Sequence, residues 1–180
     1  MQYDAVVLAG GRSRRMKVAD KTRLRIGNAS LLDRVLVAVS GAGRCIVVGE
    51  PREVVADVVW TREEPPGAGP AAAVLAALDH VAADVVVLVA GDMPLLEPAD
   101  VERLVGGVAG DGAVYVDADG YEQWLCSAWR AEALRNAGLV GGGSMRSALA
   151  GLDATKIPAP ASVLDCDTPD DLTQAEEMLP

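Results

Sequence analysis

The most continuous β-type run in the chain is Val85-Val86-Val87-Leu88-Val89, which Gly91 follows closely. A strand that is apolar on both faces belongs in the middle of a parallel sheet covered by helices. Shorter β-type runs precede it at residues 3–9, 45–48 and 58–61. Helix-like segments alternate with these runs, and this order predicts an α/β fold with three layers around a mostly parallel sheet.

Capping residues, prolines and apolar runs predict the remaining helices and strands. Ser30 can cap a helix that begins at Leu31, and Pro70 fits the first turn of a helix that ends near residue 80. Asp167 or Thr168 can cap a final helix that has Pro169 at its first position. The other expected helices are 98–105, 131–136 and 144–150, and the other expected strands are 113–116, 124–129 (antiparallel) and 162–164.

Length and charge exclude several classes of function. The 180 residues suit one domain that spans 1–180. A net charge of −10 argues against a general nucleic-acid binder, which needs a basic surface. The apolar runs fall short of the ~20 residues that span a bilayer, so we expect no membrane partner.

The cysteines and the N-terminal residues indicate a compartment. Cys45, Cys126 and Cys166 are odd in number and lack the CxxC spacing of a zinc or redox site. The first four residues lack the basic region of a secretory signal. We therefore expect reduced thiols, acting as small buried hydrophobes, in a cytoplasmic protein.

A basic segment follows the first expected strand. Gly10-Gly11 directly after a strand permits close approach of a ligand to the backbone. Residues 12–25 then hold seven Lys and Arg residues against one acid, Asp20. Glycines with cations favour a polyphosphate site, although a solvated basic loop is the alternative. The segment is not a Walker A loop, because Asp20 stands where that motif needs glycine before Lys21-Thr22.

Ligands of such folds bind beyond the carboxyl ends of the strands. Three loops lie at these ends, at residues 9–21, 62–70 and 91–94. We expect the functional site to be built from them.

The first of these loops carries a family resemblance. Leu8-Ala9-Gly10-Gly11-Arg12-Ser13-Arg14-Arg15-Met16, followed by Asp20-Lys21, resembles the signature of the molybdenum cofactor guanylyltransferases. These are nucleotidyltransferases with a Rossmann-like fold of the nucleotide-diphospho-sugar transferase (glycosyltransferase-A) type. Related cytidylyltransferases typically show Leu-Ala-Ala-Gly and a Pro-Lys pair, so the sequence here favours the guanylyl branch. Lys17-Val18-Ala19 stand where the family usually has glycines.

The resemblance implies roles for this loop. The backbone of Leu8, Ala9, Gly10 and Gly11 would contact the nucleotide. Lys21 would bind its phosphates, and Arg15 would assist the pyrophosphate leaving group. A mobile ammonium can follow charge as it moves onto a leaving group, which agrees with the role implied for Lys21.

Acidic residues in the other two loops, and near the C-terminus, also resemble family motifs. The resemblance implies that Glu63, or else Glu64, accepts from the guanine base, and a surface acid is the alternative. It assigns Asp92 of Gly91-Asp92-Met93-Pro94 to the nucleotide-bound Mg²⁺, with an Asx-type turn as the alternative. Asp167 belongs to a motif in which the family has asparagines at 165 and 167, and it either adds a metal ligand or caps the final helix.

The acceptor side carries the weakest resemblance. Asp119-Gly120 matches the family's Asp-Gly, but Trp124 stands where the family usually has proline. Trp124 and Trp129 are candidates for stacking on a pterin, and core packing is the alternative.

Taken together, the resemblance implies a Mg²⁺-dependent transfer of GMP from GTP to the phosphate of molybdenum-loaded molybdopterin. Pyrophosphate is released, and a carrier or acceptor protein of the molybdenum cofactor is an implied transient partner. One alternative is a cytidylyl- or other nucleotidyltransferase with a different phosphorylated acceptor. Another is a nucleotide-binding paralogue without turnover, because Lys17-Val18, Asp165, Asp167 and Trp124 depart from the family pattern.

Overall fold

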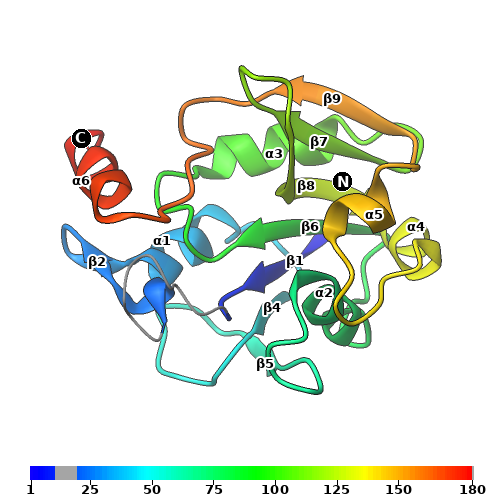
Figure 1. Ribbon diagram of the computed structural model, residues 1–180, viewed down its shortest axis with the longest axis horizontal. Coiled ribbons are helices and arrows are strands. Elements are labelled where there is room, and N and C mark those ends of the chain that lie inside the picture. The colour runs from blue at the N-terminus through cyan, green and yellow to red at the C-terminus, as the bar shows by residue number, and fades with distance from the viewer. Residues whose placement is uncertain (11–19, 180) are drawn as a thin grey trace.

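The computed structural model describes residues 1–10 and 20–179. Within this part of the chain, five strands form a sheet in the order β5-β4-β1-β6-β8 (Figure 1). These strands are β1 (Tyr3–Leu8), β4 (Cys45–Val48), β5 (Val59–Thr61), β6 (Val85–Ala90) and β8 (Glu122–Arg130). The first four are parallel, and β8 pairs antiparallel with β6. The expected mostly parallel sheet and the antiparallel return are therefore confirmed.

Two short pairs of strands flank this sheet. β7 (Gly112–Val116) pairs in parallel with β9 (Ala154–Pro158), and both lie beyond β8 (Figure 1). β2 (Arg25–Ile26) and β3 (Ala29–Ser30) form a small hairpin, with Gly27 in its turn at φ 57°.

The strand expected at 162–164 is wrong, because that segment is irregular. The strand lies earlier, at β9, where Thr155 and Lys156 are exposed. An edge strand with so little apolar pattern owes its conformation to backbone pairing with β7. Apolar periodicity could therefore not predict it.

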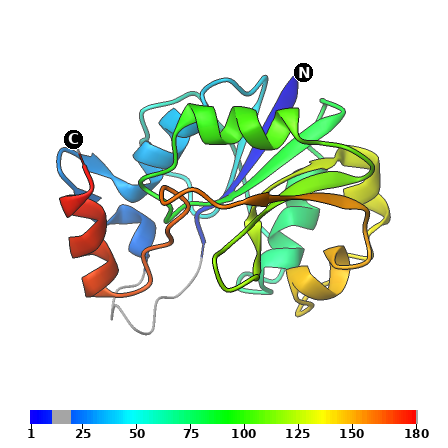
Figure 2. The same cartoon turned by 90° about the horizontal axis from the view of Figure 1, so that it is seen from above.

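Helices cover both faces of the sheet, as expected. α1 (Leu31–Ala38) and α3 (Pro98–Gly106) pack on one face, and α2 (Pro70–Leu78), α4 (Ala131–Asn136) and α5 (Met145–Leu149) pack on the other (Figure 2). Alternate residues of β6 enter the two cores: Val87 and Val89 face α1 and α3, while Val86 and Leu88 face α2. This alternation explains why the whole run had to be apolar.

Caps set the starts of the helices that matter for the site. The Ser30 side chain accepts a hydrogen bond from the Asp33 amide at 3.0 Å. α6 (Pro169–Glu177) begins after Thr168, whose hydroxyl accepts from the Asp171 amide at 3.2 Å, while Asp171 accepts in return from the Thr168 amide. Thr168, one of the two expected candidates, is thus the cap. α6 packs beside the β2–β3 hairpin around the buried residues Ile26 and Ala175.

The cysteines are free thiols, as expected. Cys126 and Cys166 are fully buried and Cys45 is half-buried. Burial, with a smaller contribution from the charge of Asp100, raises the pKa of Cys126 to about 12. A neutral, buried thiol of this kind acts as a small hydrophobe.

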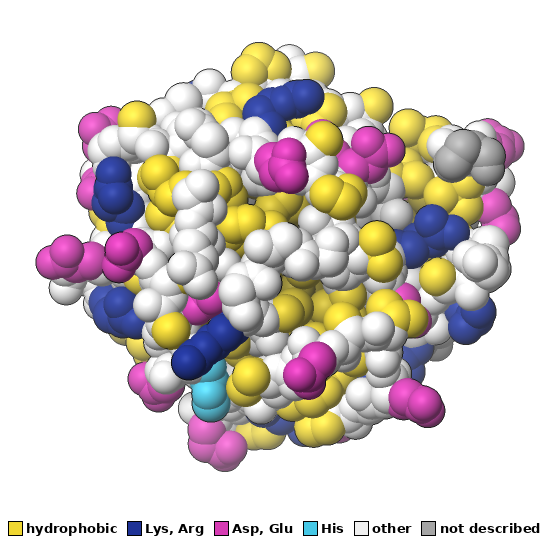
Figure 3. Space-filling model, turned by 180° about the vertical axis from the view of Figure 1, so that it is seen from behind, with side chains coloured by type: hydrophobic (Ala, Val, Ile, Leu, Met, Phe, Trp, Pro, Cys, Tyr) yellow, Lys and Arg dark blue, Asp and Glu magenta, His cyan; other side chains and the backbone are white. Residues whose placement is uncertain are grey.

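Two surface properties bear on possible partners. In the described residues, no helix is both long enough and apolar enough to cross a membrane. Acidic and basic side chains are interspersed over the face shown in Figure 3, which presents no continuous basic surface.

Candidate functional site

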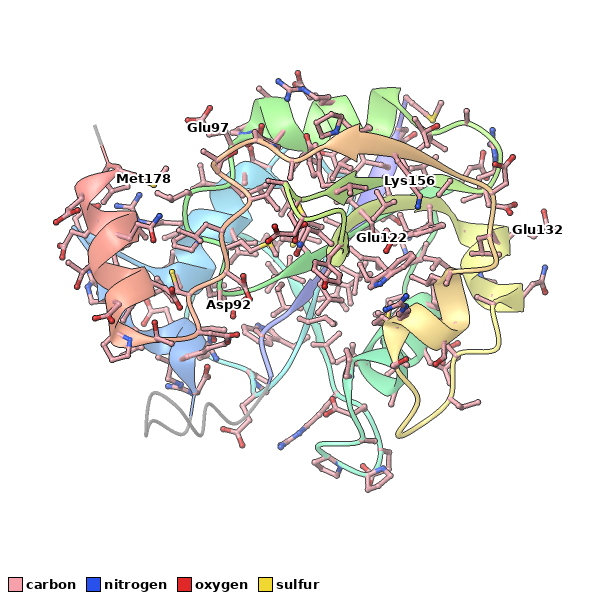
Figure 4. The ribbon with its side chains drawn as sticks, turned by 45° about the horizontal axis from the view of Figure 1, so that its top comes forward. Asp92, Glu97, Glu122, Glu132, Lys156 and Met178 are labelled. Carbon is pink, nitrogen blue, oxygen red and sulfur yellow. The ribbon has the colours of Figure 1, made fainter. Side chains whose placement is uncertain are left out.

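Lys21 joins two carboxylates at the carboxyl ends of the central strands. Its ammonium pairs with Asp92 Oδ2 and, at 2.5 Å, with Asp167 Oδ1. Asp92 follows β6 and is only 5% exposed (Figure 4). Asp167 precedes α6 and reaches the site because the Cys166 amide donates to the Asp92 carbonyl at 2.9 Å. The site therefore unites three segments that are far apart in the sequence.

A short 3₁₀ helix, η1 (Lys21–Arg23), presents Lys21 to these carboxylates. Asp20 caps η1, because its carboxylate accepts from the Thr22 amide at 3.0 Å and from the Thr22 hydroxyl at 2.6 Å. Thr22 is buried, and its methyl group lies against Gly91. A Cβ at Gly91 would stand 3.0 Å from the Leu8 carbonyl oxygen and 3.2 Å from Thr22 Cγ2. A side chain here would be tight, so glycine favours the docking of η1 between the ends of β1 and β6.

The charges of this cluster shift two pKa values. Burial by itself would lower the pKa of Lys21, but the hydrogen bonds and charges of Asp167 and Asp92 outweigh burial and raise it. Desolvation, followed by the negative charges of Asp92 and Asp167, raises the pKa of Asp165. Lys21 is thus a cation near neutral pH, and Asp165 adds a third carboxyl group beside the pair.

Two convergent carboxylates suit a small hard cation. Mg²⁺ is commonly held by one or two carboxylates together with substrate phosphate oxygens. Asp92 and Asp167 already place one oxygen each around a single cationic atom, Lys21 Nζ. In the described residues, no group of three or more His, Cys, Asp or Glu is placed to hold a metal ion. A metal at Asp92 and Asp167 would need further ligands, such as phosphate oxygens.

The end of β1 lies at the same edge of the sheet. The Leu8 carbonyl accepts from the Gly91 amide and the Ala9 amide donates to the Val48 carbonyl, both at 2.9 Å. These bonds engage the Leu8 carbonyl and the Ala9 amide within the sheet. Gly10, the next residue, is exposed. A Cβ at Gly10 would meet only Val48 O, at an ordinary 3.7 Å, so the described fold itself does not demand glycine there. The predictions for Gly11 and Arg15 lie outside the described residues.

The loop after β5 distinguishes its two acids. Glu63 is half-buried and its carboxylate accepts from the Gly67 amide at 2.8 Å, whereas Glu64 is exposed. Gly69, at φ 95°, turns the chain into α2 at Pro70. The loop is also tied to the glycine-rich segment 141–143, because the Gly142 amide donates to the Ala68 carbonyl at 2.8 Å. One oxygen of Glu63 therefore organises its own loop.

On the acceptor side, the two tryptophans have different environments. Trp129 is fully buried and its indole donates to Ser127 Oγ at 2.7 Å, so it belongs to the core. Trp124 is half-buried and stacks on Trp129, with ring centroids 6.3 Å apart. Of the two candidates, only Trp124 retains an accessible surface. Asp119-Gly120 forms the expected turn, with Gly120 at φ 87°.

Sequence reasoning missed two residues next to the site. Asp165 was noted only as a departure from a motif, and Arg52 was not considered. Arg52 pairs with Asp20 at 2.8 Å from the loop that follows β4. The position of Arg52 in the sequence could have indicated it, because its loop also follows the carboxyl end of a parallel strand, where ligands of such folds bind.

The structure is an α/β domain with its lysine–carboxylate site at the edge of the sheet where such folds bind ligands. The comparison with known families is more specific. Residues 5–147 match the sequence profile described as "MobA-like NTP transferase domain", and the chain belongs to that family.

Curated relatives agree with this assignment. A protein of Mycolicibacterium paratuberculosis named "Probable molybdenum cofactor guanylyltransferase" is 36% identical, over 90% of this chain and 88% of that protein. A protein of Opitutus terrae with the same name is 41% identical, over 64% of this chain and 61% of that protein. The chain spans less than two thirds of the length of several such relatives.

The solved "Molybdopterin-guanine dinucleotide biosynthesis protein A" of Archaeoglobus fulgidus is 24% identical. It has a TM-score of 0.74, over 97% of each chain. At this identity the likeness supports the fold, and it confirms the expected nucleotide-diphospho-sugar transferase type.

Proposed function

We propose that the chain transfers GMP from GTP to the terminal phosphate of molybdenum-loaded molybdopterin and releases pyrophosphate. A phosphate oxygen of the pterin forms the new bond to the α-phosphorus, and the bond from that phosphorus to the β-phosphate bridging oxygen breaks. The observation that carries the proposal is the cation held between two carboxylates, Lys21 with Asp92 and Asp167, at the ligand-binding edge of the sheet. The names of the curated relatives support the choice of substrates.

The roles of the chain's own residues follow from their charges. Lys21 stays protonated and can turn from the carboxylates to the phosphates, where it stabilises the charge that develops on pyrophosphate. The family resemblance implies that Arg15 assists the same leaving group and that the backbone of Gly10 and Gly11 contacts the nucleotide. The attacking phosphate is already anionic, so no side chain needs to act as a general base.

A divalent metal completes this arrangement. Asp92 and Asp167 would hold Mg²⁺, which supplies charge neutralisation at the phosphates. Without it, a triphosphate would meet the carboxylates of Asp92, Asp165 and Asp167 at close range. Nucleotidyltransferases generally use a divalent metal, which agrees with this assignment.

Base selection is assigned to Glu63. A carboxylate can accept from both N1–H and the 2-amino group of guanine, and cytosine lacks that pair of donors. The Gly67 amide holds one oxygen of Glu63 in place, and the remaining lone pairs of the carboxylate can accept from the base, whereas Glu64 is exposed. We place the reaction in the cytoplasm, with a carrier or acceptor of the molybdenum cofactor as a transient partner.

The decisive experiment measures pyrophosphate release from GTP or CTP with molybdopterin and Mg²⁺. We expect release with GTP and a rate at least about tenfold lower with CTP, because cytosine lacks the pair of donors from which Glu63 would accept. A preference for CTP would instead support a cytidylyltransferase. Binding of GTP without any turnover would support a nucleotide-binding paralogue and contradict the proposal.

A further inference from the structure

Arg52 makes three contacts from the loop after β4. Its Nη1 lies 2.8 Å from Asp20 Oδ2, and its Nη2 donates to Thr22 Oγ1 at 2.5 Å. Its guanidinium also lies over the Trp60 ring of β5, 5.8 Å from the centroid. The side chain is only 12% exposed. The planar guanidinium is thus held on one side by an aromatic ring and directed at two acceptors on the other.

Both acceptors flank Lys21. Asp20 precedes Lys21 and caps η1, and Thr22 follows Lys21 and is buried against Gly91. The Thr22 hydroxyl can give its single hydrogen to Asp20 while it accepts from Arg52, so the three side chains form one closed network. Lys21 is the residue between the two anchored positions. A displacement of either anchor therefore changes where its ammonium can reach.

A simple surface ion pair would not have this effect. Exposed pairs contribute little, because solvent screens them and long side chains must be ordered. Arg23 illustrates that case, since it also pairs with Asp20 but is 52% exposed. Arg52 differs because it is largely buried, bidentate and stacked, and these features retain its geometry.

We propose that Arg52 is the positioning residue of Lys21. It ties the segment 20–22 to the ends of β4 and β5, so that the ammonium meets Asp92 and Asp167. The same anchor also sets how far Lys21 can reach toward the nucleotide phosphates, and this second role rests on the proposed function.

The first test follows the ammonium itself and needs no activity. An amine-acylating reagent is applied to the wild-type protein and to Arg52→Ala, and mass spectrometry compares labelling of Lys21 with that of Lys156. Lys156 is a suitable reference because it is 65% exposed and pairs with Glu122, away from η1. We expect Arg52→Ala to raise Lys21 labelling several-fold, because the ammonium then leaves the ion pairs with Asp92 and Asp167 that shield it from the reagent.

The matched control is Arg44→Ala. Arg44 precedes β4 and donates to the His80 carbonyl at 3.0 Å, so it makes a guanidinium contact at the opposite end of the same strand. Its loss should leave Lys21 labelling unchanged. Arg52→Lys keeps the positive charge but loses the two-pronged guanidinium. It replaces Arg52→Ala in the comparison if circular dichroism shows that the alanine variant does not fold. Equal Lys21 labelling in the folded Arg52 variant and the wild type would overturn the proposal.

The second test measures kcat and KM for guanylyl transfer. Misplacement of Lys21 should lower kcat by about 10²-fold in Arg52→Ala, and millimolar guanidinium chloride should restore part of it where sodium chloride does not. A lower melting temperature with unchanged kcat would show a purely structural role and contradict the positioning role. If the wild type transfers no nucleotide, the proposed function fails, while the labelling result still decides the role of Arg52.

Discussion

On the proposed function, Asp92 is the residue on which the chemistry would depend most directly. It is buried, it follows the central strand, and Lys21 pairs with it. Asp92→Asn keeps the size of the side chain but removes the charge that a metal ion and Lys21 need. We expect the rate of guanylyl transfer to fall by about 10²–10³, a loss comparable to that of one strong transition-state contact.

Steady-state turnover with GTP, molybdopterin and Mg²⁺ measures this loss, and circular dichroism checks the fold. Asp57→Asn is the control, because Asp57 is an exposed acid in the segment between β4 and β5. Near-normal turnover in Asp92→Asn would exclude Asp92 as a metal ligand.

Gly91 leaves room for η1 to dock, so adding a single methyl group at this position should affect stability. In Gly91→Ala the new Cβ would press on the Leu8 carbonyl and on Thr22 Cγ2. The backbone cannot yield cheaply, so we expect a loss of about 1–3 kcal/mol in the free energy of unfolding, together with reduced turnover. Urea denaturation measures the first effect. Gly106→Ala is the matched control, since a Cβ there would meet nothing within 4 Å.

At the scale of elements, α6 matters because it follows Asp167 directly. The Thr168 hydroxyl and the Asp171 carboxylate bond reciprocally at the start of this helix. Thr168→Ala removes one of these bonds and should cost about 1 kcal/mol in the free energy of unfolding. Thr173→Ala, on the exposed part of the same helix, should change it by less than about 0.5 kcal/mol. Equal effects of the two variants in urea denaturation would contradict the role of the cap.

The same cap predicts a dependence on pH. Desolvation opposes ionisation of Asp171, but hydrogen bonds from Thr168 and from the Asp167 amide outweigh it and lower the pKa of Asp171. A lowered folded-state pKa gives stability that is present above the unfolded-state value and is lost as the pH falls through the folded-state value. We expect Asp171→Asn to lose stability at neutral pH, and its difference from wild type to shrink below about pH 4, the ordinary range for aspartate. A difference that stays constant across this range would contradict the linkage.

Element boundaries show where sequence patterns suffice. The helix starts at Ser30 and Thr168 were predictable because a cap hydroxyl and the amide that donates to it lie within three residues of each other. Apolar patterning predicts a strand at 162–164 and not at β9, because β9 pairs with β7 across 42 residues. Its exposed Thr155 and Lys156 carry no apolar alternation.

At the scale of the whole molecule, charge is unevenly distributed along the chain. Residues 12–25 carry a net charge of +6, so the remaining residues carry −16. On the proposed function, a triphosphate would meet a mostly acidic protein whose sequence holds one basic segment. Its binding would then depend on a metal that neutralises the carboxylates at the site.

The metal dependence predicts a difference in thermal stability. With Mg²⁺, GTP at about 100 times its dissociation constant should add about 2.7 kcal/mol, or a rise of about 5–11 °C in melting temperature for a chain of this size. With a chelator instead of Mg²⁺, the same GTP concentration should give a much smaller rise. Equal shifts, measured by differential scanning fluorimetry, would contradict a metal bound with the nucleotide.

The sequence by itself determined the α/β order, the buried central strand, the local caps and the place of Asp92 at a strand's carboxyl end. Each of these depends on neighbours in the chain, through apolar periodicity, turn residues and short-range hydrogen bonds. Only the tertiary structure decided that Lys21 meets Asp167, 146 residues away, and that Arg52 anchors the segment that carries Lys21. Such contacts depend on strand order and on the path of loops across the sheet, and no local pattern records which distant side chains those paths bring together.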